Sequence, residues 1–160
     1  MGKSFKSTAG FGKRMEYKLI GDMLMEGLDV YVPLVDDHCV DCIVKREDGT
    51  FIEVQIKARS ETVKEGDEAL FAAITHEKTP NFYFVFCSEG LRDENGNPVM
   101  WIMISKEFIK EAVQNKNGKN AGKRSIWFNG YRTNKKTGKK EPYCKKQFEK
   151  YICKDFSKFH

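Results

Sequence analysis

The chain has 160 residues, of which 40% are hydrophobic and 12% aromatic, enough to bury one well-packed core. It lacks both a run of eighteen apolar residues and an apolar N-terminal signal core, so we expect no membrane span and a cytoplasmic location. Five cysteines, an odd number, fit reduced thiols better than a disulfide framework. Without a Ser/Pro-rich linker, we expect a single domain over residues 1–160, with a core at about 11–114 and a basic segment at 115–160.

The net charge of +5 conceals an asymmetry along the chain. Residues 1–100 hold 12 Lys/Arg and 18 Asp/Glu, whereas residues 101–160 hold 16 and 5. This division favours an acidic region that could bind a metal ion and a separate basic region that could bind a polyanion. The alternative is a solvated lysine-rich tail.

The first predicted element is an amphipathic helix over residues 14–26. Its apolar residues recur at helical spacing, and Gly27 is a plausible C-terminal stop. Glu16 lies at the edge of the apolar stripe, where a surface glutamate is the usual interpretation.

Three strands are predicted next. Residues 28–34 form a strand that Pro33 confines to an edge or an end. A turn at 35–37, with Asp36 and Asp37 as turn-forming residues, leads into a strand that contains Asp41. The third strand covers 51–57, and the Asp48-Gly49 pair before it predicts a tight hairpin, because glycine tolerates positive φ.

The third strand alternates apolar and polar side chains. Glu53, Gln55 and Lys57 project from one face, and the hairpin places them beside Asp41 on the neighbouring strand. A carboxylate in a mostly buried strand needs a partner, which Lys57 or a divalent cation could provide. The pattern therefore indicates a candidate metal-and-water site. A half-exposed strand with mixed polar residues is the alternative for the segment taken alone.

The remaining elements complete an α/β domain with a mixed sheet. Residues 69–75 favour a short helix or loop, 82–87 a central strand and 99–104 another strand. Ser105 is expected to cap a helix that runs to about Gln114, with Glu107 in its first turn.

The C-terminal region interleaves aromatics with lysines, and we expect most of the aromatics to pack on the core. Two Gly/Asn/Lys-rich loops, 115–123 and 133–141, are positioned to reach a phosphate backbone. The candidate nucleic-acid-binding residues are Lys119, Lys123, Arg124, Arg132, Lys135, Lys136, Lys139 and Lys140.

Taken in order, these residues resemble the PD-(D/E)XK nuclease superfamily, which includes restriction enzymes and Holliday-junction resolvases. The resemblance rests on Glu16 in a first helix, Asp41 on a second strand and Glu53-Val-Gln55-Ile-Lys57 on a third, and the 30–38 run Val-Tyr-Val-Pro-Leu-Val-Asp-Asp-His is similar to small bacterial and intron-associated members. It covers roughly residues 11 to 105.

The resemblance implies a restriction-endonuclease-like core, a mixed sheet flanked by helices, that hydrolyses DNA with Mg²⁺ or Mn²⁺. Asp41, Glu53 and Gln55 would hold the metal, Glu16 would add a carboxylate, and Lys57 would orient or deprotonate the attacking water, or pair with a phosphate oxygen. Cleavage of both strands would call for a homodimer.

One residue departs from the family pattern: Gln55 stands where an acid is usual, and Glu53 carries the carboxylate two residues earlier. The alternative is therefore a catalytically inactive nucleic-acid-binding or partner-binding module on the same scaffold. A third class is a small-molecule or protein-inhibitor domain without nucleic acid.

A zinc or histidine site is not expected. Cys39 and Cys42 point to opposite faces of a strand, and His38 and His76 are isolated from one another in the sequence.

Overall fold

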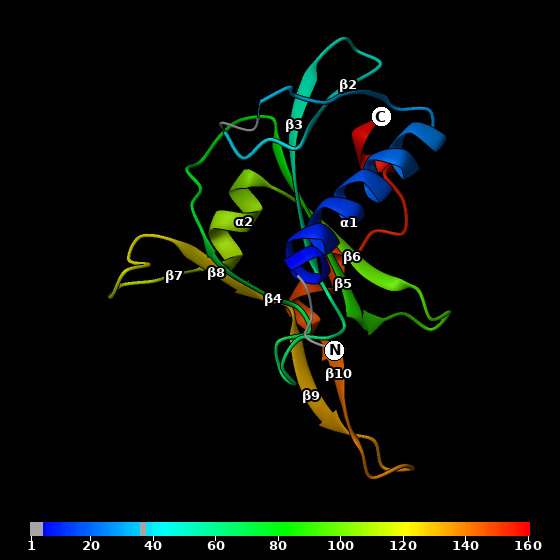
Figure 1. The fold of residues 1–160 in the computed structure, drawn as a ribbon, viewed down its shortest axis with the longest axis vertical. Helices are drawn as coiled ribbons and strands as arrows, with labels where there is room; N and C mark the ends of the chain where they lie inside the picture. Colours follow the sequence, from blue (N-terminus) through cyan, green and yellow to red (C-terminus); the bar gives the residue numbers. More distant parts are fainter. Residues whose placement is uncertain (1–4, 36–37) are drawn as a thin grey trace.

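A computed structural model describes residues 5–35 and 38–160 of the chain and has a five-stranded sheet at its centre (Figure 1). The strand order is β1-β2-β3-β5-β6. β3 and β5 run parallel, whereas the other neighbours run antiparallel. The bounds are β1 (Asp29–Tyr31), β2 (Cys42–Lys45), β3 (Phe51–Arg59), β5 (Phe82–Arg92) and β6 (Pro98–Ile104).

The two faces of this sheet have different covers. On one face, α1 (Phe5–Met25) packs its apolar stripe against Ile52, Val54 and Ile56 of β3. The opposite face is rich in aromatic rings and is covered by α2 (Ser105–Glu111) and the 3₁₀ helix η1 (Lys146–Tyr151). The predicted α/β fold with a mixed sheet flanked by helices is thus confirmed.

Further strands lie outside the central sheet. Three of them form a small sheet of order β4-β8-β7, and two more form a hairpin. Their bounds are β4 (Leu70–Ile74), β7 (Val113–Gln114), β8 (Arg124–Trp127), β9 (Asn129–Thr133) and β10 (Lys140–Cys144), and a last 3₁₀ turn, η2, covers Ser157–Phe159.

The hairpin between β2 and β3 matches the sequence prediction. Gly49 adopts a φ of 84°, in the left-handed region that favours glycine. Asp48 Oδ1 accepts a hydrogen bond from the Thr50 amide at 2.9 Å, which fixes the turn. The turn sets the register that pairs Ile43 with Glu53.

The prediction of a short helix or loop at 69–75 is wrong, because these residues contain β4. Leu70 and Phe71 pair with Trp127 and Ile126 of β8. The register shifts between Phe71 and Ile74, and Ala73 has a φ of 56°, so the strand is irregular and lacks a clean two-residue period. Its partner is also distant in the sequence.

The helix predicted at 105–114 is shorter and is not capped by Ser105. It ends at Glu111, and Val113–Gln114 join β8 as a strand. The Ser105 hydroxyl instead accepts a hydrogen bond from the Thr79 amide at 3.0 Å. Glu107 does act at the first turn, because its carboxylate accepts from the Ile104 amide at 3.0 Å.

The first predicted strand is also shorter than 28–34. It covers only Asp29–Tyr31 at the edge of the sheet, with Pro33 beyond its end, as the proline predicted. The predicted turn residues Asp36 and Asp37 lie outside the described residues.

The C-terminal segment belongs to both core clusters, as most of its aromatic residues were predicted to do. Phe156 and Phe159 lie in the α1 cluster, whereas Phe128, Phe148 and Tyr151 lie in the aromatic one. All five cysteines are free. No helix within the described ranges is long and apolar enough to cross a bilayer.

Candidate functional site

The first feature of the site is a fork where β2 separates from β3. The pairing of β2 with β3 ends at Cys42 opposite Val54, whereas β3 continues beside β5 as far as Arg59. Asp41 stands at this point. Its amide donates to the Val54 carbonyl at 2.9 Å, and its Oδ2 accepts from the Ile56 amide at 2.6 Å. The Asp41 carboxylate thus accepts the hydrogen bond that the next backbone carbonyl would accept if the pairing of β2 with β3 continued.

Glu16 of α1 lies in the same region. It is only 8% exposed, and its carboxylate accepts from Lys13 Nζ at 2.8 and 3.0 Å. The hydrogen bond from Lys13 to Glu16 raises the pKa of Lys13, and the charge of Asp41 adds to that shift. Burial, together with the smaller effects of the Asp41 and Glu16 charges, raises the pKa of the Cys42 thiol to about 12. Both carboxylates therefore act on the same two neighbours.

The polar row of β3 faces away from α1, toward the aromatic side of the sheet. Glu53, Gln55 and Lys57 are aligned with Phe82, Phe84 and Phe86 of parallel β5. None of the three polar side chains makes a hydrogen bond or ion pair with any described residue, and Gln55, although only 6% exposed, lines an open groove. Their polar groups are therefore available to water or to a ligand.

A groove of about 710 Å³ opens over this row. Glu53 and Gln55 line it together with apolar side chains and two histidines, His38 and His76. These histidines are distant in the sequence and were not predicted to share a site. The loop before β2 contributes His38, and the segment after β4 contributes His76. No local signal joins these two segments, so the sequence could not predict the groove.

His76 is held firmly in the groove wall. Its Nε2 lies 2.7 Å from Ser105 Oγ, and its ring packs against Phe82, Phe84 and Phe108 at centroid distances of 4.8, 4.8 and 5.8 Å. Burial lowers the pKa of His76 below its ordinary 6.5, and the nearby positive charge of Arg124 lowers it further. The neutral imidazole is therefore favoured.

The residues at the fork fit a hard divalent cation by their chemistry. The Asp41 carboxylate and the Gln55 carbonyl are oxygen donors of the kind that Mg²⁺ prefers, and Mg²⁺ needs only one or two carboxylates because it keeps several waters. Within the described residues, no three His, Cys, Asp or Glu side chains gather as a ready ligand set. Among the described residues, a cation at the fork would therefore be completed by Gln55 or by water.

The predicted nucleic-acid-binding residues lie on two hairpins. Lys119 and Lys123 belong to the β7–β8 connection, and Lys135, Lys136, Lys139 and Lys140 surround the β9–β10 turn, where Arg132 pairs with Glu141 at 3.5 Å. Arg124 differs from the others, because it is half-buried and donates to the Ile109 carbonyl at 3.4 Å.

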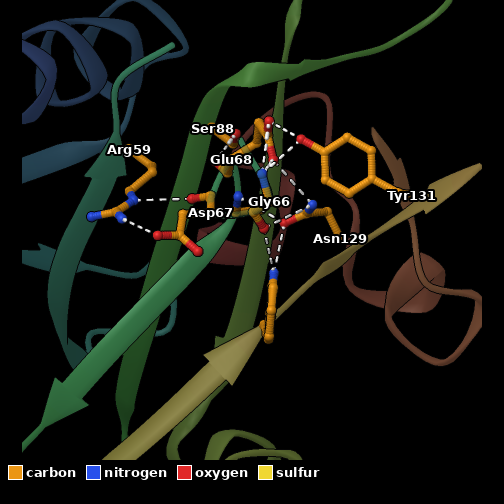
Figure 2. Close-up of polar contacts among 9 residues, drawn as sticks. Arg59, Gly66, Asp67, Glu68, Ser88, Asn129 and Tyr131 are labelled. Carbon is orange, nitrogen blue, oxygen red and sulfur yellow. Dashed lines mark hydrogen bonds and ion pairs between the residues drawn. The ribbon is translucent and has the colours of Figure 1, made fainter. Parts of the chain in front are cut away.

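A second polar cluster, which sequence reasoning missed, lies at the start of β4 (Figure 2). We call Gly66, Glu68, Asn129 and Tyr131 the Glu68 joint. The Glu68 carboxylate accepts from the Tyr131 hydroxyl, from Asn129 Nδ2 at 3.3 Å and from the Gly66 amide at 3.1 Å. Its partners Asn129 and Tyr131 lie 61 and 63 residues away in the chain, so no spacing could have indicated the cluster.

The joint is closely packed and fully bonded. Asn129 Oδ1 accepts from the Ala69 amide at 3.0 Å, and burial together with the Glu68 hydrogen bond raises the pKa of Tyr131 to about 12. A Cβ at Gly90 would lie 2.9 Å from Glu68 Cγ, so only glycine allows β5 this approach. The joint fastens β9 to the start of β4.

No family model and no curated protein matches the chain. Among solved structures, the chain is similar to a bacterial homing endonuclease, I-Ssp6803I, with 18% identity and a TM-score of 0.47, over 74% of this chain and 88% of that one.

Proposed function

We propose that this protein is a metal-dependent endonuclease that hydrolyses phosphodiester bonds in DNA, with its catalytic site at the fork. One observation carries the proposal. The Asp41 carboxylate is fixed where β2 leaves β3, 2.6 Å from the amide of Ile56, the residue between Gln55 and Lys57, and the side chains of Gln55 and Lys57 make no hydrogen bond or ion pair with a described residue. These two side chains remain available to a cation and to water.

Each residue has a role in the proposed reaction. Asp41 and Gln55 would hold Mg²⁺ or Mn²⁺ through oxygen atoms, with Glu53 or Glu16 as the further carboxylate. The bound cation would neutralise phosphate charge and make a water more acidic. Lys57 would act either as a neutral amine that takes up the proton of that water or as an ammonium that orients the water or pairs with a phosphate oxygen, while the new P–O bond forms and the bond to the leaving oxygen breaks.

The rest of the chain supports the same proposal. Both core clusters combine residues from before and after residue 115, which favours one domain over 1–160. The exposed lysines of the two hairpins would neutralise DNA phosphates. Five free thiols fit a cytoplasmic location, and a homodimer would let two sites cut the two strands of a duplex.

The test is cleavage of supercoiled plasmid and of branched DNA by the full chain, with Mg²⁺, with Mn²⁺ and with chelator. We expect cleavage only with metal, and a loss on the order of 10³-fold in Asp41→Ala, since a group that stabilises transition-state charge is removed. Glu94→Ala is the matched control, because it removes an exposed carboxylate whose only ion pair within the described ranges, with Lys154 at 3.5 Å, is solvent-exposed.

Other outcomes separate the competing functions. Salt-dependent DNA binding without cleavage under any metal condition would favour the inactive binding module. Absence of both binding and cleavage would exclude both functions. Equal cleavage by Asp41→Ala and the unmodified chain would place catalysis elsewhere.

A further inference from the structure

The β9–β10 hairpin is a two-stranded ribbon that projects beyond the rest of the molecule (Figure 1). Its five paired positions run from Asn129 with Cys144 to Thr133 with Lys140. The chain itself fixes the turn at its tip. The Asn134 amide donates to the Lys139 carbonyl at 2.9 Å, and the Gly138 amide donates to the Asn134 carbonyl at 2.8 Å. The tip therefore has a defined shape.

The charge of the ribbon is strongly positive. Residues 129–144 contain five Lys/Arg and one acidic residue, Glu141. Glu141 is already engaged, because Arg132 pairs with it at 3.5 Å and Asn134 Nδ2 donates to it at 3.2 Å. The tip lysines are exposed and make no ion pair with any other residue the structure describes, so their charge is available to a polyanion; they are Lys135, Lys136, Lys139 and Lys140.

The base of the ribbon is rigid. Asn129 and Tyr131 of β9 are locked into the Glu68 joint, as Figure 2 shows. On the opposite face, the Tyr143 ring lies over Gly130 so closely that a Cβ there would stand 2.8 Å from it. Arg132 lies over the same ring at 5.9 Å. The contacts of Asn129 and Tyr131 attach the ribbon to the segment before β4, and the Tyr143 contacts hold its two strands together.

The same contacts restrict what the ribbon can bind. Proteins grip single strands by stacking bases on aromatic rings. Both aromatic residues of the ribbon, Tyr131 and Tyr143, are committed to its own base, which leaves lysines, a threonine and backbone at the free end. The major groove of B-DNA, about 12 Å wide, admits a two-stranded ribbon without deformation, whereas the minor groove, about 6 Å wide, must be widened to accept one, and side chains cannot read the deep, narrow major groove of duplex RNA.

We propose that the β9–β10 ribbon inserts into the major groove of double-stranded DNA, with the tip lysines on the flanking phosphates. The inference rests on the proposed function and deepens it, because it names duplex DNA as the substrate class. The ribbon is the positioning element, and the Glu68 joint sets its angle to the fork.

The first test measures equilibrium binding of the full chain to a labelled duplex in chelator, at several salt concentrations, so that cleavage plays no part. The variant replaces Lys135, Lys136, Lys139 and Lys140 with Ala. We expect a loss of at least tenfold at low salt and a fall of about 3 in the slope of log affinity against log salt, since each phosphate contact contributes about 0.9.

The control removes the same charge from another exposed surface, at Lys106, Lys110, Lys146 and Lys150 of α2 and η1. It should leave the slope within about 1 of the unmodified value. An equal fall in both variants would mean that net charge alone binds DNA, and would overturn the proposal.

The second test asks which groove is used. A duplex whose cytosines carry glucosyl groups in the major groove should bind at least tenfold more weakly, whereas a minor-groove ligand should not compete. Competition by that ligand, equal binding of the glucosylated duplex, or tighter binding of single-stranded DNA or duplex RNA would refute the ribbon proposal. Because both tests measure binding in chelator, a chain that binds the duplex through the ribbon but does not cleave it refutes only the catalytic proposal, so a failure of catalysis and a failure of the ribbon remain distinguishable.

Discussion

The fork lies where β2 leaves β3, whereas the Glu68 joint lies at the start of β4, and the two polar regions differ in how their polar groups are satisfied. At the joint, the chain's own donors occupy the carboxylate of Glu68, and a glycine at position 90 allows the close approach. At the fork, Glu53, Gln55 and Lys57 make no hydrogen bond or ion pair with a described residue, and Glu53 and Gln55 line an open groove. The polar groups of the joint are satisfied within the chain, whereas those of the fork face water.

The most direct test of the fork is Lys57→Met, which removes the charge of Lys57 and keeps much of its apolar stem. We expect cleavage to fall on the order of 10²- to 10⁴-fold, the usual contribution of a positioned proton-transfer group. Thermal unfolding should change little, since Lys57 makes no ion pair with a described residue. Single-turnover cleavage and melting curves measure the two effects, and an unchanged cleavage rate would remove Lys57 from the site.

Substitutions in the Glu68 joint should instead lower the stability of the fold. Glu68→Ala leaves the Tyr131 hydroxyl, the Asn129 amide and the Gly66 amide without their acceptor, so we expect a loss of about 3 kcal/mol in the free energy of unfolding. Glu68→Gln, which keeps one oxygen acceptor, should lose less. Urea denaturation of both variants measures the difference, and equal stability of all three proteins would show that the joint contributes nothing.

A smaller effect with the reverse sign is expected at Gln55. Gln55→Met fills the same space without an unpaired amide, and should raise the free energy of unfolding by about 1 kcal/mol while it abolishes metal-dependent cleavage. The matched change in the joint, Asn129→Met, should destabilise the protein. Destabilisation by Gln55→Met would mean that its amide already has a structural role.

The smallest expected effect concerns pH. The folded pKa of His76 lies below 6.5, so the unfolded chain binds this proton more readily than the folded one. The resulting stability is complete above pH 6.5 and decreases as the pH falls toward the folded pKa. His76→Asn should therefore flatten the decline of the free energy of unfolding between pH 7 and pH 5, measured by urea denaturation. An unchanged decline would assign it to other groups.

Local patterns in the sequence predicted the elements that form by local rules. The helical stripe around Leu19 and Ile20, the Asp48-Gly49 turn and the alternation of β3 are each confirmed. The position of Asp41 beside β3 followed from that turn. The roles assigned to Asp41, Gln55 and Lys57 stay predictions, because no experiment on cleavage or metal binding tests them.

What the sequence could not predict depends on distant partners. Leu70 becomes a strand residue because Trp127 pairs with it, and Ser105 leaves the helix cap because His76 and Thr79 use its hydroxyl. The Glu68 joint and the groove arise in the same way. In each case the structural role of a residue depends on a segment that is distant in the sequence. Local propensity carries no information about that segment.

The packing of Phe156 and Phe159 against α1 has a consequence for the timing of folding during synthesis. The α1 face of the sheet is not closed until these rings are made, and the Phe156 amide then donates to Glu26 at 2.8 Å. Until Phe156 and Phe159 have been made, a nascent chain exposes apolar side chains of this cluster, such as Met23 and Val54, to solvent. The α1 cluster can therefore form completely only after residue 159 has left the ribosome.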